Sequence, residues 1–173
     1  MTVQWTALAA LSALAAHAAF SQISAAAAAC SAPAYRQFDF WIGDWDVFDA
    51  GDPTAIVAHA RVERILDGCV LLEDYQGTDG AKGRSFSMYD ASTKVWRQNW
   101  VTNRGRWLQL AGGLQGGEMA LSGVDRSAGG RARRIRGVWK LDRGGIRETA
   151  VTSTDGGRTW KPWFDLCFRP HQP

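Results

Sequence analysis

Histidine is scarce in this chain of 173 residues: it has three, and only His59 and His171 lie beyond residue 30. These two histidines are far apart in sequence, and His171 lies in a C-terminal tail that we expect to be loose. No Cys/His cluster of the sequence has metal-ligand spacing. Neither a zinc site nor a Ser-His-Asp triad is therefore expected. The Gly-rich stretch 112–117 lacks the Lys-Ser/Thr pair and the helix of a phosphate-binding loop. A formal net charge of +3 does not single out nucleic acid as a partner, and no cofactor is predicted.

Charged residues are missing from the first 30 positions, which contain no Lys, Arg, Asp or Glu. The apolar run Thr6–Ala19 is too short and too rich in alanine to span a bilayer, and small-x-small cleavage sites follow it. This pattern predicts a signal segment over residues 1–30 and export to the periplasm or the medium, although no basic residue precedes the run. The alternative is a disordered Ala-rich tail. The remainder suits one domain with one core, expected over 35–170.

Cysteine is also rare, with three in the chain. Cys30 follows three alanines and is a candidate for the lipidated first residue of a bacterial lipoprotein, which would tether the protein to a membrane. Cys69 and Cys167 then remain as an even pair that can form a disulfide in an oxidising compartment. The alternative for this pair is two buried thiols that pack as small hydrophobic groups.

Helical periodicity over three turns is absent, and after Ala34 the chain breaks into short runs bounded by Gly, Asp or Asn. Pairs such as Asp67-Gly68, Gly112-Gly113 and Gly144-Gly145 accept the positive φ that tight hairpins need. Only Gln37–Ile42 has the pattern of a helical turn. The sequence predicts an all-β fold of about ten antiparallel strands in a meander, either a closed barrel or a sandwich. The expected strands are Trp45–Asp49, Ile56–Ile65, Cys69–Gln76, Arg84–Tyr89, Val95–Val101, Trp107–Ala111, Glu118–Ser122, Arg133–Leu141, Ile146–Ser153 and Thr159–Phe168.

The face patterns favour a barrel with a partly polar interior, because both faces of several strands carry bulky apolar groups. Trp107 and Gln109 share one face of their strand, while Leu108 and Leu110 take the other. We expect the Trp/Gln face to line a cavity, since aromatic surface with sparse polar groups suits small amphipathic ligands. The alternative is a filled core in which the Gln and Glu side chains satisfy one another. The predicted ligand-binding residues are Glu73, Tyr75, Trp96, Gln98, Trp100, Trp107 and Gln109.

The segment Phe38–Val47 reads FDFWIGDWDV and places two Trp and two Phe around one Gly. Its Gly43-Asp44-Trp45 resembles the G-x-W signature that opens the first strand of lipocalins and related calycins. In that family an Arg after the last strand stacks over the Trp and closes the barrel end, and Arg169 is the matching position. The resemblance implies barrel closure by Gly43, Trp45 and Arg169, with a cation–π contact of about 1 kcal/mol.

A longer pattern is similar to that of exported bacterial lipocalin-like proteins of unknown function, and it spans nearly all of the chain after the leader. It comprises FDFWIGDWDV, Gly68–Glu73, Tyr89-Asp90 and the stretch 155–160. This resemblance implies a lipocalin-like barrel and assigns no activity. Two extra strands and the lack of a clear C-terminal helix set the chain apart from true lipocalins.

Two further motifs are expected to be structural. Ser153–Trp160 fits the S-x-D-x-G-x-T-W Asp box of sialidase propellers, but one box cannot make a propeller, so it predicts a hairpin held by Asp155. The basic cluster Arg131–Arg136 is expected on a solvated outer face, where Arg134 and Arg136 lie together. Its functional alternatives are a patch for anionic lipid or glycan, or one Arg turned inward to meet a ligand carboxylate.

Three functions fit these patterns. The leading one is an exported lipocalin-like binding protein, monomer or dimer, that holds a small apolar or amphipathic molecule. The second is an isomerase or hydrolase on the same scaffold that uses Glu73 with Tyr75 or Tyr89. The third is a structural or interaction module of the cell envelope with a solid barrel. The shape and lining of the interior distinguish these functions.

Overall fold

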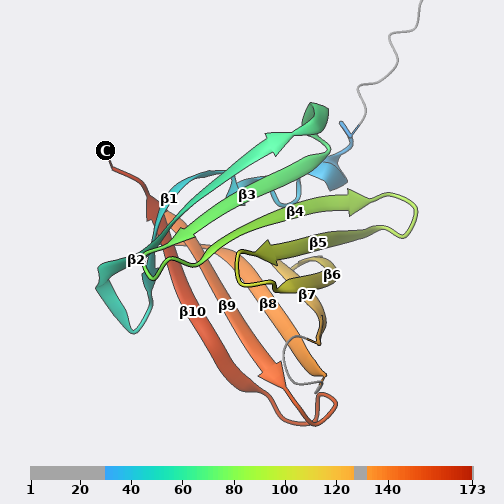
Figure 1. The fold of residues 1–173 in the computed structure, drawn as a ribbon. Helices are drawn as coiled ribbons and strands as arrows, with labels where there is room; N and C mark the ends of the chain where they lie inside the picture. Colours follow the sequence, from blue (N-terminus) through green and yellow to red (C-terminus); the bar gives the residue numbers. More distant parts are fainter. Residues whose placement is uncertain (1–29, 127–131, 173) are drawn as a thin grey trace, which may run out of the picture.

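A computed structural model describes residues 30–126 and 132–172, so the predicted signal segment before Cys30 lies outside it. In this part of the chain ten antiparallel strands form one closed barrel, in chain order, with β1 meeting β10 (Figure 1). The all-β antiparallel barrel predicted from the turn signals is confirmed. The strands are β1 (Gly43–Asp49), β2 (Asp52–Ile65), β3 (Val70–Gly77), β4 (Lys82–Asp90), β5 (Val95–Thr102), β6 (Trp107–Gln115), β7 (Glu118–Asp125), β8 (Arg133–Asp142), β9 (Gly145–Ser153) and β10 (Lys161–Pro170). Three short 3₁₀ segments accompany them: η1 (Pro33–Arg36), η2 (Asp39–Trp41) and η3 (Leu66–Gly68).

One predicted turn lies inside a strand. Gly112 and Gly113 belong to β6, which continues to Gln115. A Cβ at Gly112 would lie 2.0 Å from the carbonyl oxygen of Ala120 in the neighbouring β7. The glycine therefore permits a close approach of two backbones instead of marking the end of a strand.

The barrel closes along a seam between β1 and β10, but the predicted closing contact is wrong. Arg169 is the ladder partner of Asp46, and its guanidinium lies 4.3 Å from the ring centroid of Phe48. Asp46 and Phe48 share the outer face of β1, whereas the buried Trp45 points into the core. Ladder partners face the same side of a sheet, and neighbouring residues of a strand face opposite sides. Arg169 therefore lies on the outer face with Asp46 and cannot stack on the indole of Trp45. The outer cation–π contact is made with Phe48 instead.

Gly43 still has a definite structural role at the start of β1. A Cβ there would lie 2.4 Å from Cζ2 of Trp45, so only glycine leaves room for the indole to fold back over the strand. The indole Nε1 of Trp45 donates to the backbone oxygen of Trp41 at 3.1 Å. Gly43 and Trp45 thus attach the first strand to the 3₁₀ segment that precedes it.

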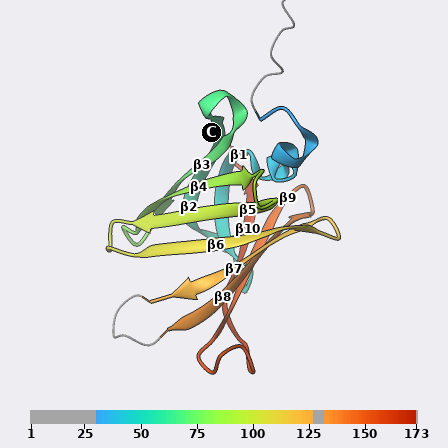
Figure 2. The same ribbon diagram turned by 90° about the vertical axis from the view of Figure 1, so that its right-hand side faces the viewer.

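An aromatic cap fills one end of the barrel, as the Phe/Trp-rich opening motif predicts. Phe38 and Trp41, from the segment that holds η1 and η2, are fully buried and stack at a centroid distance of 5.0 Å. Phe38 also meets Trp96 and Trp139 edge-on, at 5.7 and 5.6 Å. Figure 2 shows this segment, in blue, at the same end of the barrel as the turn between β2 and β3. We refer to Phe38, Trp41, Trp96 and Trp139 as the aromatic cap.

A disulfide joins Cys30 to Cys69 and ties the chain before the aromatic cap to the start of β3. The predicted Cys69–Cys167 bridge is wrong, and Cys167 is a free thiol. Cys167 lies on β10, and β1 and β2 separate that strand from β3, so it is out of reach of Cys69. The disulfide also leaves no thiol on Cys30 for a lipid. Cys30 belongs to the folded domain, not to the leader alone.

The Asp box forms the connection between β9 and β10. The Asp155 carboxylate accepts hydrogen bonds from the backbone N–H groups of Arg158 and Thr159, both at 2.9 Å, and from the Thr159 hydroxyl at 2.6 Å. These bonds, with one from Ser153, hold the pKa of Asp155 well below its usual range. The prediction of a hairpin fastened by Asp155 is confirmed.

Candidate functional site

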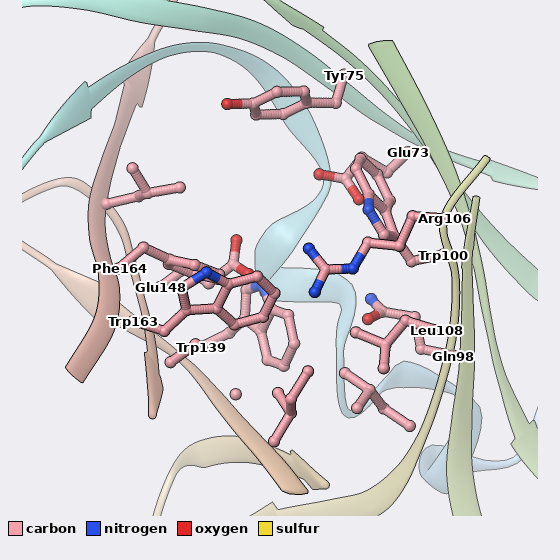
Figure 3. Close-up of a pocket in the computed structure, with 15 residues that line it drawn as sticks. Glu73, Tyr75, Gln98, Trp100, Arg106, Leu108, Trp139, Glu148, Trp163 and Phe164 are labelled. Atoms are coloured by element: carbon pink, nitrogen blue, oxygen red, sulfur yellow. The ribbon is translucent and has the colours of Figure 1, made fainter. Parts of the chain in front are cut away.

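The barrel interior beside the aromatic cap contains a cavity of about 310 Å³. Trp139 belongs to both regions, because it packs on Phe38 and also lines the cavity. Figure 3 shows Glu73 and Tyr75 on one wall, Trp163 and Phe164 on another, and Arg106 reaching between them. The lining consists of Glu73, Tyr75, Gln98, Trp100, Arg106, Leu108, Leu110, Ile135, Gly137, Trp139, Glu148, Ala150, Trp163, Phe164 and Leu166. Aromatic and aliphatic surface therefore dominates, with a few polar groups set into it.

The structure brings four of the seven predicted ligand-binding residues into the cavity wall. Glu73, Tyr75, Gln98 and Trp100 all line it, from β3 and β5. Trp96 lies on the same face of β5 but is buried in the aromatic cap, where its Nε1 donates to Oε1 of Gln37 at 3.1 Å. Trp96 is therefore a structural residue and does not line the cavity.

The prediction for β6 is wrong, because Trp107 and Gln109 lie on the outside. Trp107 is 65% exposed, and Gln109 donates to Asn99 on the outer surface. Ladder partners share a face of the sheet, and Leu108 and Leu110 are the partners of Trp100 and Gln98. The leucines therefore face inward. Side-chain bulk suggested the wrong face, and only the register with β5 decides it.

Glu73 is the most unusual of the predicted residues that line the cavity. Its side chain is buried, and Oε2 accepts a hydrogen bond from the Ser85 hydroxyl at 2.8 Å. Burial raises the pKa of Glu73 to about 7, the Ser85 bond opposes this rise, and the charge of Asp74 adds to it. A carboxyl group with such a pKa exchanges its proton near neutral pH.

A second carboxyl group, Glu148 on β9, faces the same cavity. Burial raises its pKa well above the usual value, and the charge of Glu73 raises it further, while Trp139 acts in the opposite direction. Two carboxyl groups whose negative charges repel one another in an apolar site titrate as a coupled pair, because the loss of one proton makes the other harder to remove. Glu148 is not among the residues predicted from the sequence, although it shares a face of β9 with the buried Ile146 and Ala150 and so points inward.

Tyr75 and Gln98 complete the polar groups of the wall. Burial raises the pKa of Tyr75 to about 12, and the charges of Glu148 and Glu73 contribute. Its phenol is therefore a neutral hydrogen-bond donor and acceptor at physiological pH. Gln98 donates through Nε2 to the hydroxyl of Ser87 at 3.1 Å. The site can accept hydrogen bonds at its carboxyl groups, donate them from its hydroxyl, and hold or release one proton near pH 7.

A cationic cluster around Trp163 marks the rim of the cavity. The guanidinium carbons of Arg106 and Arg133 lie 4.6 and 4.7 Å from the centroid of the Trp163 ring. Both arginines pair with the buried Asp125, Arg133 at 2.8 Å. The Arg106 side chain is 24% exposed, so it stands between the interior and solvent. This cluster is not indicated by the sequence, because its members come from four different strand ends.

A β-bulge explains why two consecutive aromatic residues line the cavity. The register between β10 and β9 shifts between Pro162 and Phe164, so Trp163 has no ladder partner there. A bulge turns an extra side chain to the same side of a strand. Trp163 and Phe164 therefore both face inward, which strict alternation does not allow.

The described residues of the predicted basic cluster lie on the outside of β8, apart from Arg133 at the rim. Arg134 and Arg136 are exposed, and Arg136 stacks over Trp160 at 5.0 Å. Their expected place on a solvated outer face is confirmed. Arg131 lies outside the described residues.

The cavity carboxyl groups do not form part of a three-residue metal-ligand set. In the part of the chain that the structure describes, one group of three His, Cys, Asp or Glu side chains has its ligand atoms within 4.8 Å of one another: Asp46, His59 and His171, at the barrel seam. The two histidines are far apart in sequence, but the fold brings them together. No helix of the described residues is long and apolar enough to cross a membrane.

A comparison of the chain with protein-family models and with curated proteins finds no match. The fold and the geometry of the cavity are therefore the basis of the functional argument that follows.

Proposed function

We propose that this protein binds a small, largely apolar molecule in the barrel cavity and holds it by a hydrogen-bond-donating group placed at Glu73 and Glu148. The observation that carries the proposal is this pair of carboxyl groups, Glu73 buried and Glu148 partly buried, on a largely aromatic and aliphatic wall. The cation among the lining residues, Arg106, pairs with Asp125. A protonated amine is the ligand group that best compensates two carboxylates on an apolar wall, and a hydroxyl is the next best.

The cavity volume limits the size of the ligand. A volume of about 310 Å³ lies at the lower end of known ligand pockets. It is roughly twice that of an engineered apolar cavity of about 150 Å³ that binds benzene. The proposed ligand is therefore a one- or two-ring amine or alcohol, with its rings against Trp100, Trp139 and Trp163 and its polar group toward the carboxyl pair.

Matched probes test this proposal. Naphthylethylamine, naphthylethanol and naphthylacetate share one ring system and differ in the polar group, and the tryptophans of the cavity report binding through their fluorescence. We expect the amine to bind best and the acetate worst. The variants Glu73→Gln and Glu148→Gln should each weaken amine binding about tenfold, the loss of one charge-assisted hydrogen bond. Trp107→Ala, on the outer face, should not change it.

The natural ligand can be sought directly. Protein purified under native conditions should release a small molecule on extraction with organic solvent, and native mass spectrometry should show its added mass. If no molecule co-purifies, and none of the three probes binds at millimolar concentration, the cavity is not a binding site and the proposal is wrong.

A specific observation supports a second candidate, an acid–base enzyme on the same scaffold. Glu73 is buried beside Tyr75 and has a pKa of about 7, which suits a general acid or base at neutral pH. Chemical change of the co-purified molecule by the wild-type protein, and not by Glu73→Gln, would establish an isomerase or hydrolase. An unchanged molecule favours the binding protein. The cavity leaves little support for the third candidate, an envelope module with a solid barrel.

Export of the protein also remains a proposal, and the disulfide between Cys30 and Cys69 supports it, because such bonds persist in oxidising compartments. We expect the mature protein to begin at or before Cys30 and to carry no lipid on that residue. N-terminal sequencing of the protein from periplasmic and culture fractions tests this. Incorporation of labelled palmitate would contradict it.

A further inference from the structure

The seam between β1 and β10 carries a cluster of three side chains that the cavity does not use. Oδ1 of Asp46 lies 2.8 Å from Nδ1 of His59 and 2.8 Å from Nδ1 of His171. The two imidazole rings stand nearly perpendicular, at 89°, with their centroids 5.4 Å apart. One carboxylate oxygen and two imidazole nitrogens therefore point at a common place.

The backbone ladder holds this arrangement in position. Asp46 on β1 and His59 on β2 are direct partners in the antiparallel pair. His171 follows the end of β10, and its backbone N–H donates to the Asp44 carbonyl at 2.9 Å, which continues the ladder by one step. Residues 169 and 171 share a face of that extended strand, so His171 reaches the outer side where Asp46 and His59 lie. The C-terminal segment is fixed here, contrary to the expected loose tail.

The burial of the three side chains suits an ion that arrives from solvent. The Asp46 side chain is only 12% exposed, because the imidazoles cover it, while those of His59 and His171 are 53% and 37% exposed. The carboxylate is therefore shielded from competing water, and the two nitrogen ligands can be reached from outside. Both histidines project from the barrel surface, so this cluster is separate from the interior cavity.

We propose that Asp46, His59 and His171 bind one divalent transition-metal ion of the zinc, nickel or copper type. Two imidazoles and one carboxylate are ligands that these ions accept, and three protein ligands leave further positions open for water or another small ligand. Around a tetrahedral ion with bonds of about 2.0 Å, ligand atoms lie about 3.3 Å apart. The observed 2.8 Å separations need to widen by only about half an ångström.

The alternative is a clasp without metal, in which the two imidazoles only donate hydrogen bonds to Asp46. The two arrangements differ in what an added ion does. A metal site binds one equivalent and depends on all three side chains, whereas a clasp takes up no ion at micromolar concentration.

Calorimetric titration of the full-length protein, as purified from cells, tests the proposal. The protein should carry a histidine-free affinity tag and be treated with a chelator, which is then removed by dialysis. We expect one equivalent of zinc, nickel or copper to bind with a dissociation constant in the micromolar range or below. His59→Ala, His171→Ala and Asp46→Asn should each weaken binding at least tenfold. Glu63→Gln, an exposed carboxylate on the same face of β2, is the matched control and should bind as the wild type does.

A thermal unfolding measurement separates loss of the site from loss of the fold. In the presence of a chelator each variant should show a cooperative transition, and added zinc should raise the transition temperature of the wild type and of Glu63→Gln but not of His171→Ala. If His171→Ala shows no transition, a chain that ends at Pro170, which removes the same ligand, takes its place. The proposal would be overturned if none of the three ions binds to the wild type at millimolar concentration. It would also be overturned if His59→Ala and His171→Ala bind the ion as tightly as the wild type does. Neither result would affect ligand binding in the cavity.

Discussion

The two halves of the barrel interior are built from the same wall but filled in opposite ways. At one end, Phe38 and Trp41 enter from a segment before the first strand and pack against Trp96 with almost no exposed surface. Toward the other end, aromatic residues such as Trp100 and Trp163 surround a space of about 310 Å³. A core filled by a separate segment stabilises the barrel without using the inward side chains of every strand. The remaining inward side chains are then free to shape a cavity.

The polar groups also differ between the two halves. At the cap end the indole N–H groups of Trp96 and Trp45 donate to Gln37 and to the Trp41 carbonyl, whereas that of Trp41 is buried without an acceptor among the described residues. In the hollow half the pKa values of Glu73 and Glu148 are raised, and neither carboxyl group forms an ion pair with a described residue. Buried polar groups that are not fully compensated cost stability. We infer that the cap end contributes stability and that the hollow end serves the proposed binding, and four predictions test this division.

The largest effect is expected at the cap. Phe38→Ala should lower the free energy of unfolding by about 3–5 kcal/mol, because it leaves a void among Trp41, Trp96 and Trp139. Urea denaturation measures this loss. Phe164→Ala is the control, since Phe164 is half-buried and already borders a cavity, and its loss should be clearly smaller. Equal losses at the two sites would contradict the division between the halves.

The second prediction concerns the disulfide that anchors the cap segment. Cys30 and Cys69 are 39 residues apart in sequence, and cross-linking a loop of that size stabilises a fold by about 4 kcal/mol through the unfolded chain. The double variant Cys30→Ser with Cys69→Ser should lose about that amount in urea unfolding. Cys167→Ser, which removes the free thiol, should lose little. Amine binding in the cavity should survive in the double variant, and its disappearance would show that the two ends are not independent.

The third prediction concerns the pH dependence that the hollow half introduces. The folded protein holds the Glu73 proton more tightly than the unfolded chain, since burial raises the pKa from 4.5 to about 7. Stability from this group is therefore fully present below about pH 4.5 and is lost as the pH rises to about 7, by roughly 3 kcal/mol. Glu73→Gln removes this dependence, so the difference between variant and wild type in urea unfolding should grow in favour of the variant over that interval. A difference that stays constant over that interval would mean that Glu73 is not the buried acid.

The smallest effect separates the inner from the outer face of neighbouring strands. Trp107→Ala should change the free energy of unfolding by less than about 0.5 kcal/mol, because the side chain is 65% exposed. Trp100→Ala should weaken probe binding, since that indole lines the cavity. Fluorescence titration of both variants distinguishes the two positions. A binding loss in Trp107→Ala as large as in Trp100→Ala would contradict the register between β5 and β6.

Much of the architecture could be predicted from local signals. Turn residues with positive φ separate the strands, and alternation along β3 and β5 correctly groups Glu73 with Tyr75 and Gln98 with Trp100. Alternation divides a strand into two faces but does not tell which one is inside. That choice depends on the register with the next strand. For this reason the sequence pattern predicts Trp107 inside and Leu108 outside, which is the reverse of the structure.

The missed features share one physical property, which is that they depend on contacts distant in sequence. The Cys30–Cys69 bridge depends on a segment that resembles a leader, and the rim cluster around Trp163 gathers residues from several strand ends. The bulge before Phe164 breaks the alternation that predicts faces. Glu148 is the exception, since the pattern Ile146, Glu148, Ala150 indicates an inward carboxyl group.

The ring of strands has a consequence for how this protein behaves in concentrated solution. Every described strand has a neighbour on both sides, so none of them is an edge strand onto which a strand of another molecule could add along its full length. An edge strand forms only when two neighbouring strands of the barrel separate. We expect this at the ladder between β1 and β10, because it is short and runs only from Trp45 to Asp49. The pairing of β1 with β10 around Asp46 therefore protects the protein from amyloid-like assembly. Substitutions that weaken this pairing should accelerate aggregation before the remaining strands separate.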